Sequence, residues 1–89
     1  MEIEKGSVVI SRAGRDKGSH LAVTGFLEDR VLVCDGGERP LERPKAKNLK
    51  HIAVTCRKLS EYDMAANSRL RRALKDTEAH GNGLSGEAG

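Results

Sequence analysis

The stretch SVVISRAGRDKG, residues 7–18, indicates how the chain folds, because a β-branched run ends there in a charged loop. Val8, Val9 and Ile10 favour a strand, and Gly14 and Gly18 bracket three charged residues in the loop. The pattern therefore predicts a strand over residues 7–11, followed by a tight strand-to-strand loop that presents cations to solvent.

The residues after this loop continue as short strands and turns. His20–Leu27 alternates in the manner of a strand, and Gly25 marks a bulge or a bend within it. Arg30–Cys34 is almost continuously apolar, and Asp35-Gly36-Gly37 supplies the positive-φ positions that a tight antiparallel hairpin needs. Two further strands are expected in this part of the chain.

Residues 38–58 contain the less regular part of the predicted sheet. Pro40 and Pro44 limit Glu38–Lys45 to an edge strand or an extended connection, because proline cannot donate a ladder hydrogen bond. Lys45–Leu49 has the composition of a single helical turn, and His51–Arg57 alternates cleanly as a strand. The residues that share one face of this last strand are Ile52, Val54 and Cys56.

Five short strands joined by turns predict a mainly β fold, a small barrel over residues 1–58 whose closure protects the strand edges. After Lys58 the apolar residues recur every three or four positions, which predicts a short C-terminal helical segment over 59–76, packed on or beside the barrel. Ser60 is a candidate N-cap, with Leu59 and Met64 as a hydrophobic staple, and Asn67 is an equally good cap for a shorter helix. Residues 77–89 are polar and rich in glycine, as in a flexible, disordered tail.

The distribution of charge points to an anionic partner. The formal net charge is +3, and residues 1–58 hold twelve Lys or Arg against eight Asp or Glu. Residues 43–58 hold six Lys or Arg and no acidic residue, whereas a protein surface normally mixes both signs. A merely solvated surface is the alternative explanation for this run and for the charged first loop, but phosphate better accounts for so uneven a distribution.

Other classes of function find no support in the sequence. Cys34 and Cys56 lack the spacing of a metal site, and each lies in an apolar strand pattern that favours a buried, reduced thiol. His20, His51 and His80 stand in unrelated contexts without a triad or paired carboxylates, so we expect no enzyme, cofactor, metal or small-molecule substrate. The first loop lacks the Lys-Ser/Thr pair of a nucleotide-binding P-loop.

No signal sequence or membrane-spanning run is apparent, which predicts a cytoplasmic protein with no membrane partner.

The first loop and the residues around it resemble the KOW motif, which is a strand, a basic loop with a central glycine and a returning strand. The resemblance lies in Ser7-Val8-Val9 through Arg12-Ala13-Gly14-Arg15-Asp16-Lys17-Gly18, then Val31-Leu32-Val33 with Asp35-Gly36. The continuation Arg39-Pro40-Leu41-Glu42-Arg43-Pro44-Lys45-Ala46-Lys47-Asn48-Leu49-Lys50-His51 resembles bacterial KOW-domain RNA-binding proteins similar to archaeal and eukaryotic large-subunit ribosomal proteins. This resemblance covers Lys5–Val54 and implies an SH3-like barrel that binds RNA, with ribosomal RNA as the target. The family's helical tail is shorter here, and its end is similar to Asn67–Leu74.

We therefore predict a non-catalytic, ribosome-associated protein that acts in translation by contacting RNA phosphates, with ribosomal proteins as further partners. One Phe and one Tyr in the whole chain leave no expected platform for stacking bases. The alternative is a protein-interaction module that docks on a ribosomal or transcription partner through strand edges or the Leu70/Leu74 helix face. The RNA-binding hypothesis requires folding to bring the first loop alongside the later cationic run. Its predicted contact residues are Arg12, Gly14, Arg15, Lys17, Arg43, Lys45, Lys47, Asn48, Lys50 and His51.

Overall fold

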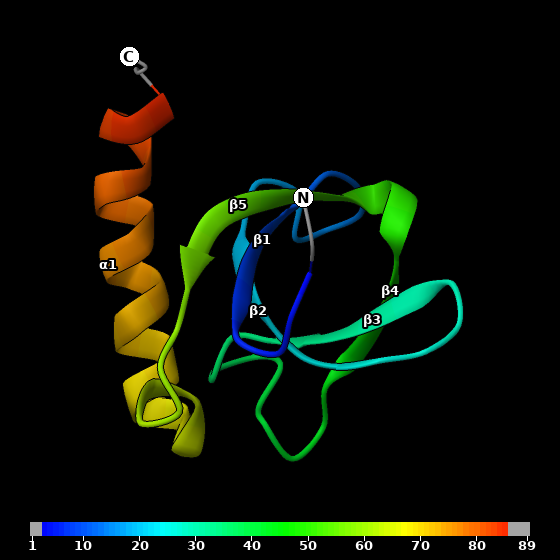
Figure 1. The fold of residues 1–89 in the computed structure, drawn as a ribbon, viewed down its shortest axis with the longest axis horizontal. Helices are drawn as coiled ribbons and strands as arrows, with labels where there is room; N and C mark the ends of the chain where they lie inside the picture. The colour runs from blue at the N-terminus through cyan, green and yellow to red at the C-terminus, as the bar shows by residue number, and fades with distance from the viewer. Residues whose placement is uncertain (1–2, 86–89) are drawn as a thin grey trace.

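The computed structural model describes residues 3–85, with the surroundings of side chains described as far as Glu78. It contains five strands, two short 3-10 turns and one long helix (Figure 1). In chain order these are β1 (Ser7–Ser11), β2 (His20–Phe26), β3 (Arg30–Cys34), β4 (Lys45–Asn48), η1 (Leu49–His51), β5 (Ile52–Lys58), η2 (Asp63–Ala65) and α1 (Asn67–Ser85).

The strands form one antiparallel sheet in the order β4-β3-β2-β1-β5. The sheet curls into a small barrel, and α1 stands beside it against β1, β2 and β5 (Figure 1). The predicted mainly β fold, with five strands in a small barrel and a C-terminal helix, is therefore confirmed. Among the described residues, no helix is both long enough and apolar enough to cross a lipid bilayer.

The central strands bury apolar side chains on both faces, which explains why their sequences read as nearly continuous apolar runs. Neighbouring residues of a strand point to opposite faces, so Val9 lies inside the barrel while Val8 packs beneath α1. The inner cluster consists of Val9, Leu21, Val23, Val31, Val33 and Ile52. The outer cluster, through which the helix is attached to the sheet, consists of Val8, Ala22, Cys34, Leu70 and Leu74.

Two irregularities bend the sheet, and only one of them was predicted. The expected irregularity at Gly25 is confirmed by a shift in the β2–β3 register between Val23 and Gly25. A second shift lies in the β1–β5 pairing, where Val9 pairs with Val54 but Ser7 pairs with Lys58. The additional residues on β5 interrupt its alternation.

The two cysteines therefore differ in their surroundings. Cys34 is buried as predicted, and burial, aided by the neighbouring Asp35 carboxylate, raises the pKa of its thiol to about 11. Cys56 is exposed, so its predicted burial is wrong. The bulged stretch of β5 places Cys56 outside the alternation that keeps Ile52 in the barrel interior.

The segment between β3 and β5 departs from prediction in one place. Lys45–Asn48 is the edge strand β4 and not a helical turn, because its residues pair with Arg30–Val33 of β3. The helical turn comes directly afterwards as η1, whose first turn is capped by the side chain of Asn48, which accepts a hydrogen bond from the backbone N–H of Lys50 at 2.8 Å. Residues 38–44 form a connection, one of the two alternatives expected for them.

Neither proposed cap after Lys58 caps a helix in the predicted way. The N-cap residue of the short turn η2 is Tyr62, which makes no side-chain cap hydrogen bond, and the hydroxyl oxygen of Ser60 accepts from the backbone N–H of Asp63 at 3.2 Å. Asn67 begins α1, and its side-chain oxygen accepts from the backbone N–H of Leu41 at 2.8 Å, which ties the helix to the β3–β4 connection. The helix begins within the predicted segment 59–76 and ends beyond it.

The helix continues beyond Asp76 through part of the stretch predicted to be a flexible tail, and it reaches Ser85. Thr77 lies at the start of this continuation, where it is buried and its hydroxyl donates to the backbone oxygen of Ala73 at 2.9 Å. The last residues of the predicted tail, 86–89, lie outside the described residues.

Substituting Gly36 with Ala tests how closely the β3–β4 connection packs against α1. Gly36 has a φ of +82°, and a Cβ there would overlap the backbone oxygen of Asn67 and lie 3.0 Å from the backbone nitrogen of Arg71. We expect Gly36→Ala to lower the free energy of unfolding by about 2 kcal/mol or more, measured by urea denaturation.

The matched control for this prediction is Gly37→Ala. A Cβ at Gly37 would meet nothing nearer than the Asp35 carboxylate, at 3.7 Å, so this change should stay within about 0.5 kcal/mol of the wild type. Equal effects of the two substitutions would contradict the close packing of Gly36 on the helix.

Candidate nucleic-acid interface

The loop between β1 and β2 is held by its own backbone hydrogen bonds. The N–H of Gly18 donates to the oxygen of Ser11 at 2.8 Å, and the N–H of Ser19 donates to the oxygen of Asp16 at 2.8 Å. Gly14 has a φ of +86°, which favours glycine at this turn. The loop is therefore rigid at its base, while Arg15 and Lys17 project from it as exposed side chains.

A buried ion pair attaches this loop to β4. The ammonium group of Lys47 lies 2.9 Å from Oδ1 of Asp16 and donates a further hydrogen bond of 3.1 Å to the backbone oxygen of Ala13. The side chains of Lys47 and Asp16 are only 7% and 17% exposed. A third residue, Ser11, donates its hydroxyl to the same carboxylate oxygen at 2.8 Å. These contacts therefore fix the position of the loop relative to the edge strand β4.

The environment of Asp16 favours its charged form. Burial raises the pKa of this carboxyl, but the hydrogen bonds from Lys47 and Ser11 and the positive charge of Lys47 outweigh burial and leave the pKa below its usual value. Asp16 therefore stays ionised at neutral pH and keeps Lys47 in place.

A second link joins the loop to η1. The backbone N–H of Arg12 donates to the backbone oxygen of His51 at 2.8 Å. Figure 1 shows the β1–β2 loop and η1 at the same end of the barrel. We call the exposed side chains at this end the cationic face. Its members are Arg12, Arg15, Lys17, Lys50 and His51.

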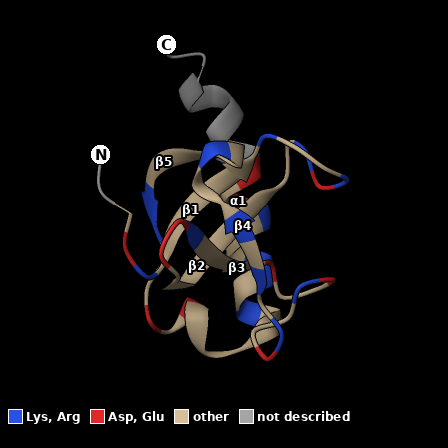
Figure 2. Ribbon diagram, turned by 90° about the vertical axis from the view of Figure 1, so that its right-hand side faces the viewer, with Lys and Arg blue, Asp and Glu red and all other residues tan. Residues whose placement is uncertain are grey.

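The cationic face retains its charge, because none of the ion pairs found among residues 3–78 involves a member of it. The one carboxylate within the loop, Asp16, is already paired with Lys47. Figure 2 shows the two lysines of β4, Lys45 and Lys47, beside this end of the barrel. Folding has thus brought two cationic segments together that are far apart in the sequence.

The remaining predicted contact residues lie in different places. Lys47 was predicted to contact RNA, but its buried ammonium group is not available to a ligand and instead holds the loop on β4. Lys45 shares that face of β4 and is half-buried. Asn48 flanks the cationic face and uses its side-chain oxygen to cap η1. Arg43 precedes β4 in the β3–β4 connection, which lies at the opposite end of the barrel in Figure 1.

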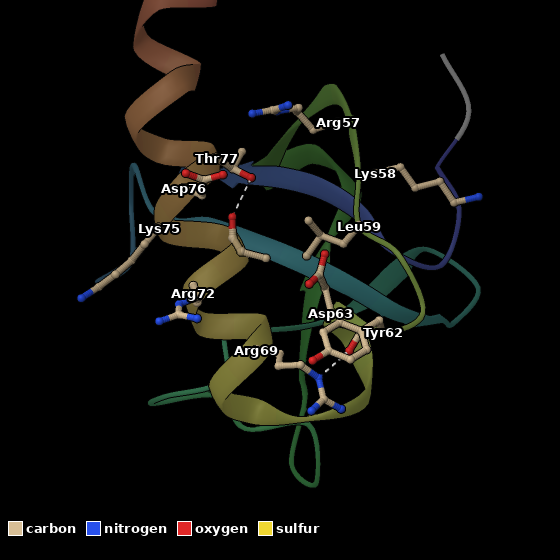
Figure 3. Close-up of a pocket in the computed structure, with 11 residues that line it drawn as sticks. Arg57, Lys58, Leu59, Tyr62, Asp63, Arg69, Arg72, Lys75, Asp76 and Thr77 are labelled. Carbon is tan, nitrogen blue, oxygen red and sulfur yellow. Dashed lines mark hydrogen bonds between the residues drawn. The ribbon is translucent and has the colours of Figure 1, made fainter.

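The aromatic side chains of Phe26 and Tyr62 are a feature of the surface that sequence reasoning did not use. Phe26 and Tyr62 are both exposed, the latter to 68%, although no stacking platform was expected. Tyr62 lines a cleft between α1 and β5 that also contains Arg57, Arg69 and Arg72 (Figure 3). A signal was present, because Arg69 and Arg72 are spaced three residues apart and so share one face of a helix.

The helix face proposed for protein docking is not available. Leu70 and Leu74 are buried in the outer cluster against the sheet and cannot also meet a partner. Among the described residues, no group of three or more His, Cys, Asp or Glu side chains is arranged to hold a metal ion.

Comparison with known proteins places the chain in a family. No family model matches the sequence. The chain is, however, 32% identical over 72 residues to a protein of Methanococcus maripaludis described as large ribosomal subunit protein eL14, covering 81% of this chain and 88% of that protein. The chain belongs to the eL14 family.

The match to eL14 extends over most of the chain. A match of 72 residues in a chain of 89 necessarily includes residues 18–72. These comprise β2 to β5, residues 59–66 between β5 and α1, which we call the linker, and the start of α1. The match therefore covers most of the barrel and the beginning of the helix.

Replacing Lys47 tests the ion pair that holds the loop on β4. Lys47→Met leaves the Asp16 carboxylate buried without its partner, so we expect the free energy of unfolding to fall by about 3 kcal/mol. The double variant Lys47→Met with Asp16→Asn removes both charges and should recover most of that loss in urea denaturation. Lys50→Met, on the exposed surface nearby, is the control and should change little.

The same pair predicts a dependence of stability on pH. The pKa of Asp16 is lower in the folded chain than its usual 3.8, so the stability it contributes is present above about pH 4 and is lost as the pH falls through the folded value. We expect the wild type to lose stability below about pH 4 more steeply than the Lys47→Met, Asp16→Asn double variant. Parallel curves for the two proteins, measured by urea denaturation in a series of buffers, would contradict this assignment.

Proposed function

We propose that this chain is a non-catalytic RNA-binding protein, with an SH3-like barrel of the KOW type, that associates with the large ribosomal subunit in the cytoplasm. The observation that carries the proposal is the joining of the first loop to β4 and η1 by Lys47–Asp16 and Arg12–His51. Membership of the eL14 family supports the ribosome as the site of action and ribosomal RNA and ribosomal proteins as partners.

The chemistry of the cationic face suits the phosphate backbone of folded RNA. Arginine and lysine side chains on a rigid loop bind phosphate oxygens, and such contacts recognise the shape of RNA more than its sequence. Within the proposed site, Arg12, Arg15, Lys17 and Lys50 supply the charge, and His51 is available for a phosphate or sugar contact. Gly14 permits the tight turn of the loop, and Lys47 positions the loop. Lys45 and Asn48 flank this surface.

Neutralising the cationic face should weaken RNA binding in a salt-dependent way. We expect the Arg15→Gln, Lys50→Gln double variant to bind a double-stranded RNA hairpin more weakly than the wild type. The slope of log K against log salt should become less negative by about 2, because roughly one unit is lost per phosphate contact. Fluorescence anisotropy over a series of salt concentrations measures both quantities.

The matched control is the Lys5→Gln, Arg71→Gln double variant, which removes the same charge from exposed positions outside the cationic face. Circular dichroism should show the same fold in all three proteins. Equal slopes for both double variants would count against the proposed site, because binding would then follow net charge alone.

Sedimentation of a cell lysate tests association with the ribosome. We expect the wild type to travel with ribosome-sized particles on a sucrose gradient and to be released when ribonuclease degrades the RNA. The Arg15→Gln, Lys50→Gln variant should appear mainly in the light fractions. Retention on a protein partner after ribonuclease treatment would instead favour docking through protein contacts.

A further inference from the structure

The cleft between α1 and β5 combines three arginines with an exposed aromatic ring (Figure 3). Arg57 comes from the last part of β5, Tyr62 from the linker, and Arg69 and Arg72 from α1. It does not overlap the cationic face, because no residue of that face lines it. The cleft is therefore a separate candidate site.

Two of its side chains are already held in position. The guanidinium carbon of Arg69 lies 4.2 Å from the centroid of the Tyr62 ring, and its Nε donates to the backbone oxygen of Tyr62 at 2.9 Å. This contact occupies one side of the ring, yet the residue remains 68% exposed. Tyr62 thus has a fixed orientation and a surface on which a planar group can stack.

The other two arginines of the cleft, Arg57 and Arg72, could each bind an anion. The Nε atom of Arg57 is buried and has no hydrogen-bond partner among the residues the structure describes, which is unusual for a charged donor. Arg72 is exposed and, in the part of the chain with described side chains, takes part in none of the ion pairs. A phosphate bound between β5 and α1 would contact Arg72 and the part of Arg57 that lines the cleft, but not the buried Nε itself.

The carboxylates of the cleft narrow the choice of ligand. Asp63 and Asp76 also line it, so the cleft is not simply a cationic patch that attracts any polyanion. A peptide of Asp and Glu residues can donate backbone N–H groups to Asp63, but it has no ring that could stack on Tyr62. A nucleotide offers a phosphate for arginine, a base that stacks on tyrosine and, in cytosine, an amino group that donates to a carboxylate.

We propose that the α1–β5 cleft binds an unpaired stretch of RNA, with Arg57 and Arg72 on phosphates and a base stacked on Tyr62. This inference rests on the proposed RNA-binding function and adds a second, chemically different contact to it. The cationic face engages structured RNA, while the cleft holds a single strand beside it. Binding through both would be stronger than through either alone, because the second contact becomes intramolecular.

The test uses the full chain and two probes, a fluorescent oligocytidylate of about ten nucleotides and the double-stranded hairpin. We expect Tyr62→Ala to weaken oligocytidylate binding about tenfold, which is the typical effect of losing one stacked base. Tyr62→Phe keeps the ring and should bind as the wild type does. Arg72→Glu should also weaken binding about tenfold and make the salt slope less negative by about 0.7.

The matched control is Arg71→Glu, the same charge change on the next residue of α1. Arg71 lines a different hollow together with His20 and Glu38, so its effect on oligocytidylate binding should be small. Circular dichroism and thermal unfolding check that each variant is folded. Equal losses for Arg71→Glu and Arg72→Glu would overturn the proposal, as would unchanged binding in Tyr62→Ala or displacement of the probe by polyglutamate.

The hairpin probe separates this inference from the proposed function. The cleft variants should bind the hairpin as the wild type does, whereas Arg15→Gln with Lys50→Gln should lose hairpin binding. If the hairpin binds through the cationic face and oligocytidylate does not bind at all, the cleft proposal alone is overturned. If neither probe binds the wild type, both proposals are overturned.

Discussion

The ion pair between Lys47 and Asp16 is the contact on which the arrangement of the cationic face depends. It lies between the first loop and the edge strand β4, where both side chains are largely shielded from water. A buried charge is tolerated only when a partner and hydrogen bonds compensate it, and Ser11 and the backbone of Ala13 provide these hydrogen bonds. The loop is thereby fixed relative to η1, and its remaining cations are directed to solvent.

The second constraint is the burial of the sheet on both faces. Val8 and Cys34 face α1 while Val9 and Val33 face the barrel interior, so the helix is an integral part of the core. This arrangement fixes which face of α1 points outward. The burial of Leu70 and Leu74 also determines where Arg69 and Arg72 lie. Both arginines are placed at the edge of the buried helix face, beside β5.

The sequence was a good guide wherever a local pattern determines structure. The bounds of β1 and β3 agree with prediction because β-branched runs end there at turn residues, and Gly25 was rightly expected to mark an irregularity. Prediction failed where pairing with a distant segment decides the outcome. Lys45–Asn48 is a strand because it pairs with β3, and Cys56 is exposed because β5 bulges against β1.

In the candidate site, too, the sequence predicted local features but not contacts between distant segments, and here those contacts are between charged groups. A run of Lys and Arg residues in the sequence shows where positive charge is concentrated. It does not show which of these side chains form ion pairs with carboxylates from other parts of the chain. Lys47 and Lys50 are three residues apart, yet one is buried against Asp16 and the other is exposed on the cationic face. Residues 59–89, in contrast, hold four Lys or Arg against five Asp or Glu and looked unremarkable, because a net count ignores which charges share a helix face. Only the packing of α1 on the sheet reveals that two of its arginines line the same cleft as Arg57 of β5.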